Sequence, residues 1–201
     1  MKELASVLEI PGVWRGLVNQ RVQALPTGHA GLDALLPGGG LPCGALTEVL
    51  HAKPGVGELS LILPIMARLT QGGSRAVLMA PPYIPYAPAL AQAGVVLPRL
   101  VVMQPPSQDE VPWGFEQSLH AGVFGMVVAW GQRTTSEALL RLQRAAENAN
   151  SMGILMRPLS AAAQASHAAL RLCLRPTANG TDVEILKCRG GRTGQHWLLA
   201  A

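Results

Sequence analysis

The sequence has few charged residues and little cysteine, and each shortage excludes a class of protein. Charged residues make up only 14% of the 201 residues while 49% are apolar, a balance that excludes a disordered chain. The three cysteines, Cys43, Cys173 and Cys188, are odd in number and lack CxxC spacing, so neither a disulfide framework nor a zinc site is indicated. The five histidines lack the close HxxxH spacing of a metal-binding helix, and no metal is predicted.

Long hydrophobic runs are also missing. The run from Leu59 to Met66 is too short for a bilayer and contains Pro64, and the first ten residues lack the core and cleavage site of a secretory signal. The formal net charge is only +4, with Lys and Arg scattered along most of the chain, which is a weak signal for nucleic acid. We therefore expect a cytoplasmic protein with no membrane contact and at most weak DNA contact.

Hydrophobic periodicity predicts the fold. Short runs rich in Val, Leu and Ile alternate from Ala45 onward with helical patterns, which is the βαβ pattern of a parallel sheet. In the last predicted helix, Thr134 and Glu137 have the spacing of a capping box. The predicted strands are 45–50, 75–80, 100–103, 125–130 and 153–158, and the predicted helices are 59–69, 87–93, 112–121 and 135–150.

The C-terminal part has a different pattern. Two longer predicted strands, 169–177 and 181–191, are joined at Asn179-Gly180, a strong hairpin signal, and 195–200 can add another strand. The sequence thus predicts a single α/β core domain over residues 26–201, with a mostly parallel central β-sheet flanked by helices and a C-terminal antiparallel hairpin. Residues 1–25 are expected to form an N-terminal arm.

The loop after the first predicted core strand is where such a sheet would hold phosphate. A working P-loop, GxxxxGK[ST], needs its Lys to neutralise the phosphates and its hydroxyl to bind magnesium. With Gly57 at the second glycine, Ala52 falls at the first glycine, Glu58 at the lysine and Leu59 at the hydroxyl. Unit charges 4 Å apart interact by about 4 kcal/mol at an effective dielectric of 20, so Glu for Lys replaces attraction by a similar repulsion. Only Gly57 of the signature is kept, so we expect a vestigial phosphate loop, which also contains Gly55, with the nucleotide chemistry lost.

Several separated motifs, in the right order, resemble the RecA core and, more specifically, the ImuA family. The segment LPTGHAGLDALLPGGGLPCGALTEVL (25–50) is similar to the opening of the RecA core, and the resemblance covers most of the chain. The GVGEL loop is itself a hallmark of the ImuA family. The segments that look like ImuA are PGGGLP (37–42), GVGELSLILP (55–64), VLMAPPYIPYAPAL (77–90) and LKCRGG (186–191).

The resemblance to RecA implies further losses. The water-activating glutamate that follows the second core strand falls on or beside Pro81, and the metal-binding aspartate falls on Trp130. With Glu58 and Leu59 in the loop as well, the residues that would bind phosphate, activate water and bind the metal are all replaced. A degenerate RecA-like ATPase, without cofactor and without catalysis, is therefore expected.

The family resemblance also implies a role. ImuA proteins act in SOS-induced, error-prone translesion synthesis beside ImuB, an inactive Y-family polymerase homologue, and a mutagenic C-family polymerase, and are linked to contact with RecA. The expectation is an accessory protein, associated with the nucleoid when induced, that works through protein contacts. One alternative is a SulA-like inhibitor of cell division that binds FtsZ; a second is a residual ATPase. Homo-oligomerisation stays open.

Three groups of side chains are candidates for contact with a partner or with DNA. Trp14 and Arg15 in the arm can anchor an interface, although Trp14 can equally pack on the protein's own core. Arg141 and Arg144 share a helix face that can also be merely solvated. The third group lies where RecA carries basic residues at its protomer interface; its members are Lys187, Arg189 and Arg192.

Overall fold

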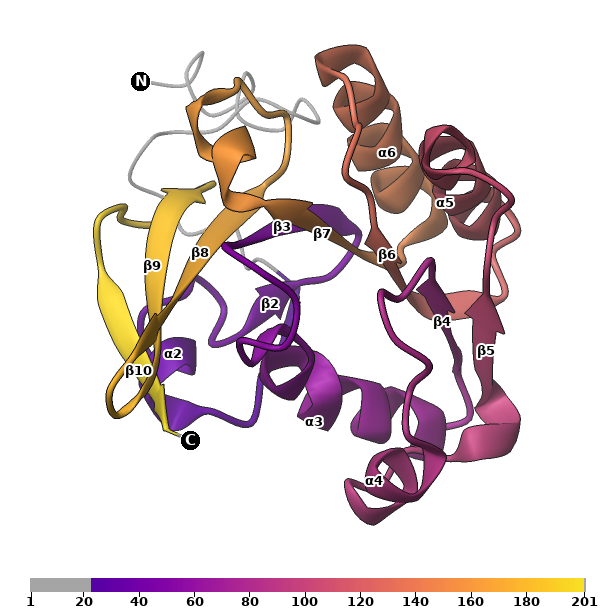
Figure 1. Ribbon diagram of the computed structural model, residues 1–201, viewed down its shortest axis with the longest axis horizontal. Coiled ribbons are helices and arrows are strands. Elements are labelled where there is room, and N and C mark those ends of the chain that lie inside the picture. The colour runs from indigo at the N-terminus through magenta and orange to yellow at the C-terminus, as the bar shows by residue number, and fades with distance from the viewer. Residues whose placement is uncertain (1–22, 201) are drawn as a thin grey trace, which may run out of the picture.

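The computed structural model describes residues 23–200, which form one eight-stranded sheet with helices on both faces (Figure 1). The strand order is β10-β9-β8-β3-β7-β6-β4-β5. The strands are β3 (Ala45–His51), β4 (Arg75–Met79), β5 (Leu100–Met103), β6 (Phe124–Trp130), β7 (Met152–Pro158), β8 (Leu170–Thr177), β9 (Gly180–Cys188) and β10 (His196–Ala200).

The six strands from β8 to β5 are parallel to their neighbours, whereas β9 pairs antiparallel with both β8 and β10. The turn into β9 lies at Asn179-Gly180, and Gly180 has a φ of 137°, a conformation that favours glycine. The predicted fold class, a mostly parallel sheet with a C-terminal antiparallel hairpin, is confirmed.

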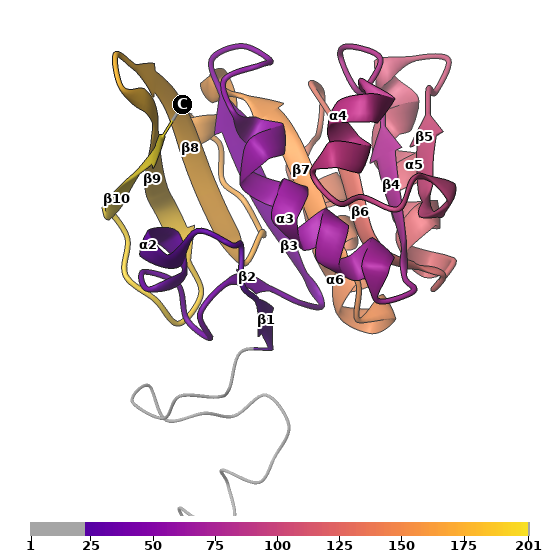
Figure 2. The same cartoon turned by 90° about the horizontal axis from the view of Figure 1, so that it is seen from below.

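Helices cover the two faces of the sheet in two separate layers (Figures 1 and 2). The helices α3 (Glu58–Gln71) and α4 (Ala87–Gln92) lie on one face, and α5 (Val111–His120) and α6 (Ser136–Ala149) lie on the other. Successive side chains of a strand point to opposite faces of the sheet, so each strand contributes to the core on both sides. On β6, Val128 packs in the cluster beneath α3, while its neighbour Val127 packs in the cluster beneath α5 and α6. Near-continuous burial of the central strands follows from this double cover.

The start of the described chain pairs locally. The short strands β1 (Ala24–Leu25) and β2 (Leu41–Pro42) are antiparallel, and the one-turn helix α2 (Ala30–Asp33) lies between them in the sequence. Asp33 accepts hydrogen bonds from both the backbone N–H and the hydroxyl of Thr27. Trp14 and Arg15 lie outside the described residues, and the division into arm and core at residue 25 stays a prediction.

One cap is displaced from its predicted position. The side chain of Thr135, not of Thr134, accepts the hydrogen bond from the N–H of Ala138 and begins α6. The predicted capping box at Thr134 was therefore wrong by one residue. The reason lies in the core, because the carbonyl of Thr134 accepts a hydrogen bond from the buried guanidinium of Arg157 and stays outside the helix.

A buried charge cluster joins three neighbouring strands in the middle of the sheet, β8, β3 and β7. Glu48 on β3 is fully buried, and its two oxygens lie 2.7 Å from Nη1 of Arg157 on β7 and 2.8 Å from Nε of Arg171 on β8. The second contact is an ion pair without hydrogen-bond alignment. Arg171 also donates to the carbonyl of Ala161, so the cluster holds the 3-10 helix Leu159–Ala163 against the sheet.

Candidate functional site

The loop between β3 and α3 has the backbone form of an anion cradle. Gly55 and Gly57 have φ values of 85° and 99°, which L side chains rarely adopt, and α3 begins directly after Gly57. Such conformations turn successive N–H groups inward, and the N-terminus of the following helix adds positive potential. The loop geometry therefore still suits an anion.

The anion in this cradle is the protein's own. The N–H of Gly55 donates to Oε1 of Glu58 at 2.8 Å, and the N–H of Val56 donates to Oε2 at 2.9 Å. Glu58 is only 4% exposed, so its carboxylate is buried among the groups that a phosphate would need. A phosphate could enter only by displacing this carboxylate.

The C-terminal strands hold the loop from outside. The hydroxyl of Thr181 on β9 donates to the carbonyl of Val56 at 2.5 Å. Leu199 on β10 packs so closely that a Cβ on Gly57 would lie 3.1 Å from its Cδ2 atom. The loop is therefore held in place on one side by the start of α3 and on the other by the antiparallel strands β9 and β10.

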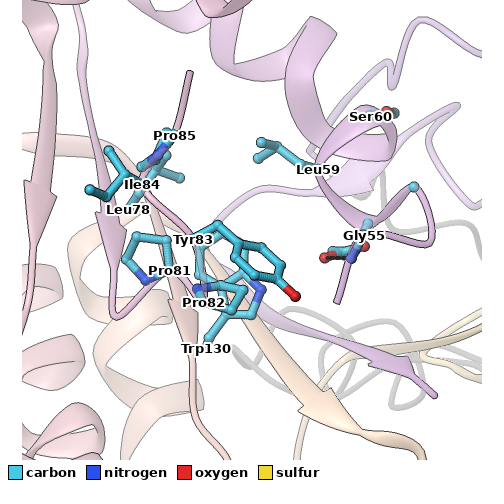
Figure 3. A pocket seen from close by; sticks show the side chains of 12 residues that line it. Gly55, Leu59, Ser60, Leu78, Pro81, Pro82, Tyr83, Ile84, Pro85 and Trp130 are labelled. Carbon is cyan, nitrogen blue, oxygen red and sulfur yellow. Dashed lines mark hydrogen bonds between the residues drawn. The ribbon is translucent and has the colours of Figure 1, made fainter. Parts of the chain in front are cut away.

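The loop borders an apolar hollow at the carboxyl ends of the parallel strands, with a cavity volume of about 240 Å³ (Figure 3). Glu58, Leu59, Pro81 and Trp130, the positions predicted to have lost nucleotide chemistry, all line it. Ala52 is exposed and is not part of the lining. The remaining lining residues are Gly55, Gly57, Ser60, Leu78, Pro82, Tyr83, Ile84 and Pro85.

The chemistry of this lining does not fit a nucleotide with magnesium. No Lys or Arg lines the hollow, and the single carboxylate, Glu58, is occupied by backbone N–H groups. Triphosphate needs cationic neutralisation and a hydroxyl or carboxylate for the metal, and apolar Leu59, Pro81 and Trp130 supply neither. Among the described residues, no group of three His, Cys, Asp or Glu side chains is placed to hold a metal ion.

Sequence reasoning missed an apolar surface beside the hollow. Tyr83, Ile84 and Tyr86, in the segment between β4 and α4, are 70%, 92% and 72% exposed. The sequence predicts no helix or strand between residues 80 and 87, and none of these three side chains is a sequence candidate. The signal was present in the letters PPYIPYAP, because two tyrosines and an isoleucine between prolines have no helix or strand in which to be buried.

The basic candidates do not gather around the hollow. Nε of Arg141 lies 3.1 Å from Oε2 of Glu116, and Nη1 of Arg189 lies 3.0 Å from Oε1 of Glu147, so both arginines pair with acids on neighbouring elements. Arg144 is exposed on α6. Exposed ion pairs of this kind contribute little to stability and leave the arginines able to change partners.

The C-terminal basic group is only partly free for contact. Nζ of Lys187 donates to the carbonyl of Ser166 at 2.7 Å, and burial, followed by the nearby charges of Arg189 and Arg171, lowers the pKa of its ammonium. Arg192 is exposed in the loop before β10. The group therefore combines one half-buried ammonium with two exposed guanidinium groups.

Residues 23–200 contain no helix that is both long and apolar enough to cross a membrane.

Comparison with known proteins finds similarity to ImuA, SulA and RecA proteins. Protein ImuA of Caulobacter vibrioides is 27% identical over 203 residues, covering 88% of this chain and 83% of that protein. The cell division inhibitor SulA of Edwardsiella piscicida is 32% identical over 56% of this chain and 71% of its own length. Protein RecA of Thermus aquaticus is 30% identical over 54% of this chain, but only 32% of its own length is matched.

A crystal structure of SulA from Pseudomonas aeruginosa superimposes with a TM-score of 0.47 and 24% identity, covering 56% of this chain and 97% of that chain. No family model matches the sequence. The ImuA match extends over most of both proteins, while the SulA and RecA matches cover about half of this chain. The chain is therefore similar to ImuA over most of its length, with SulA and RecA as further similar proteins.

Proposed function

We propose that this protein is a non-catalytic adaptor in SOS-induced, error-prone translesion synthesis, acting through contacts with an ImuB-type polymerase homologue and with RecA. Similarity to ImuA over most of the chain supports an accessory role in the DNA damage response. The named partners and the place in a mutagenic polymerase assembly are the proposed part.

The observation that carries the proposal is the occupied phosphate loop. Glu58 fills the cradle formed by the N–H groups of Gly55 and Val56, so the loop is satisfied without a ligand. The buried apolar strands and the positive-φ glycines still build the fold, although the groups for nucleotide chemistry are replaced. This combination favours a protein that acts through its surface and not through a reaction centre. A RecA-like core without a reaction centre is suited to protein recognition.

Affinity capture with the full chain as bait tests the role. We expect the bait to retain purified ImuB homologue or RecA from the same organism. It should not retain purified FtsZ. Retention of FtsZ alone would overturn the proposal in favour of a SulA-like inhibitor, a second candidate that the SulA matches support.

A titration with labelled ATP and magnesium tests the loss of catalysis. We expect no binding in the micromolar range, because Glu58 would repel the phosphates and the hollow offers them no cation. Micromolar binding would instead identify a residual ATPase and overturn the non-catalytic assignment.

A further inference from the structure

We propose that the hollow beside the vestigial phosphate loop is a docking groove for an extended, uncharged, proline-containing segment of a partner protein. The proposal rests on the proposed function of protein recognition and deepens it by assigning a surface and the chemistry of its occupant. Three independent observations support it: the exposed aromatic rim, an unpartnered buried donor and the charge of the lining.

The first observation is the apolar rim. Tyr83 and Ile84 line the hollow and are largely exposed, although burying such side chains in the protein would be favourable. Proline residues on either side hold the segment extended and keep these two side chains outside the core. Surfaces that combine tyrosine, tryptophan and apolar groups recognise polyproline segments, whose rings stack on aromatic faces.

The second observation is an unpartnered donor. Trp130 lines the same hollow and is only 7% exposed. Its indole Nε1 nevertheless has no hydrogen-bond acceptor among the described residues. Buried tryptophan N–H groups usually find an acceptor. A polyproline helix leaves every backbone carbonyl free to accept, which makes it a natural partner for this N–H.

Tyr83 lines the same hollow as that donor. Figure 3 draws the Tyr83 ring in front of the Trp130 indole, and both side chains line the hollow. Because Tyr83 is mostly exposed, it can turn aside without leaving a cavity in the core. An entering segment can thus stack on the Tyr83 ring and place a carbonyl oxygen at Trp130 Nε1.

The third observation is charge. The single carboxylate of the lining, on Glu58, already accepts two backbone hydrogen bonds, and the lining contains no Lys or Arg. An anionic ligand would meet the charge of Glu58, and a basic side chain would find no open carboxylate. Charge complementarity therefore selects a neutral occupant, and an extended proline-containing segment also loses little conformational freedom on binding.

Tryptophan indole signals in an NMR titration test the proposal. The chain has four tryptophans, so selective isotope labelling gives four indole N–H signals, and Trp130→Phe assigns the one in the hollow. On addition of acetylated decaproline amide to the full chain, we expect the Trp130 signal to move downfield, with a Kd of about 1 mM or tighter. The Trp197 signal should stay in place, because that residue does not line the hollow.

Two surface variants locate the binding site. Tyr83→Ala combined with Ile84→Ser should weaken decaproline binding by about fivefold or more, since both side chains form the rim. Trp113→Ala is the matched control, because Trp113 is also exposed and aromatic but lies on α5 outside the hollow. The double variant replaces exposed side chains only, so the test does not depend on the folding of Trp130→Phe.

Several results would overturn the groove. These are a Trp130 signal that does not move up to about 10 mM decaproline, an equal movement with ATP, or a movement that survives the double variant. A signal that moves with the concentration of the protein alone would make a second copy the occupant and reject the proposal. Capture of ImuB homologue or RecA without decaproline binding would refute the groove and leave the proposed function standing.

Discussion

At the scale of single residues, Glu58 links the loss of nucleotide chemistry to the stability of the fold. Its carboxylate replaces a ligand, since it receives the N–H groups of Gly55 and Val56 at the start of α3. A loop that evolved to bind an external anion would otherwise keep buried, unpaired donors, which destabilise a fold. The same side chain that repels phosphate therefore stabilises the loop by filling it.

The amide variant Glu58→Gln tests this double role. Removing the charge weakens two charge-assisted hydrogen bonds at a helix N-terminus, so the free energy of unfolding should fall by about 1–3 kcal/mol in urea denaturation. Binding of ATP with magnesium should still be absent, because Leu59, Pro81 and Trp130 remain in the lining.

Ser60→Ala is the matched control for this variant, since Ser60 is exposed in the first turn of α3 and lines the same hollow. Its stability should match that of the wild type within about 0.5 kcal/mol. Recovery of ATP binding by Glu58→Gln would mean that Glu58 alone blocks the site and that the other replacements do not matter.

At the scale of elements, buried charge joins three strands and two connections. Glu48 lies between Arg157 and Arg171 on the neighbouring strands, and the arginines extend the contact to the carbonyls of Thr134 and Ala161. The two arginines therefore hold the connection before α6 and the 3-10 helix after β7 against the sheet.

Glu48→Gln is expected to be strongly destabilising. Two guanidinium groups would stay buried with no counter-charge, which typically costs about 3–5 kcal/mol of unfolding free energy. Chemical denaturation followed by circular dichroism measures the change.

Glu116→Gln is the comparison for that variant, because Glu116 pairs with Arg141 at the surface, where the arginine side chain is 56% exposed. Removing a surface ion pair should change stability by less than about 1 kcal/mol. Equal effects of the two variants would show that the buried cluster contributes no more than a surface contact.

At the scale of the whole molecule, the sequence was sufficient for the architecture because its signals are local and repeated. Apolar runs of strand length, helical periodicity and the Asn179-Gly180 turn each act within a few residues, and together they predicted the parallel sheet and its hairpin. Contacts between distant residues carry no such signal. Glu48 and Arg157 are 109 positions apart, and nothing in either neighbourhood indicates the pair.

The candidate site follows the same division between local patterns, which the sequence reveals, and contacts that depend on the assembled fold. The loss of the P-loop lysine and hydroxyl followed from the letters, but the return of Glu58 into its own loop depends on the left-handed conformations of Gly55 and Gly57. The shift of the α6 cap from Thr134 to Thr135 likewise depends on a buried arginine from another strand. Local patterns therefore locate a site, while its hydrogen bonds require the assembled fold.

The assembled fold also couples the hairpin to the vestigial loop, through the hydrogen bond from Thr181 on β9 to the Val56 carbonyl. Thr181→Val keeps the shape of the side chain and removes this bond. We expect the amides of Gly55 and Val56 to exchange with solvent about five to ten times faster, which corresponds to the loss of one hydrogen bond of about 1 kcal/mol. Hydrogen exchange followed by NMR measures the rates.

Thr177→Val separates this coupling from a general effect on the hairpin. The hydroxyl of Thr177 is exposed near the turn and bonds to the carbonyl of Gly180, so its loss should leave exchange in the loop unchanged. If Thr181→Val also leaves the loop unchanged, Glu58 alone holds it and the hairpin is only a neighbour. If exchange increases in Thr181→Val only, a partner that binds the antiparallel strands can alter the hollow, since the same loop forms one side of it.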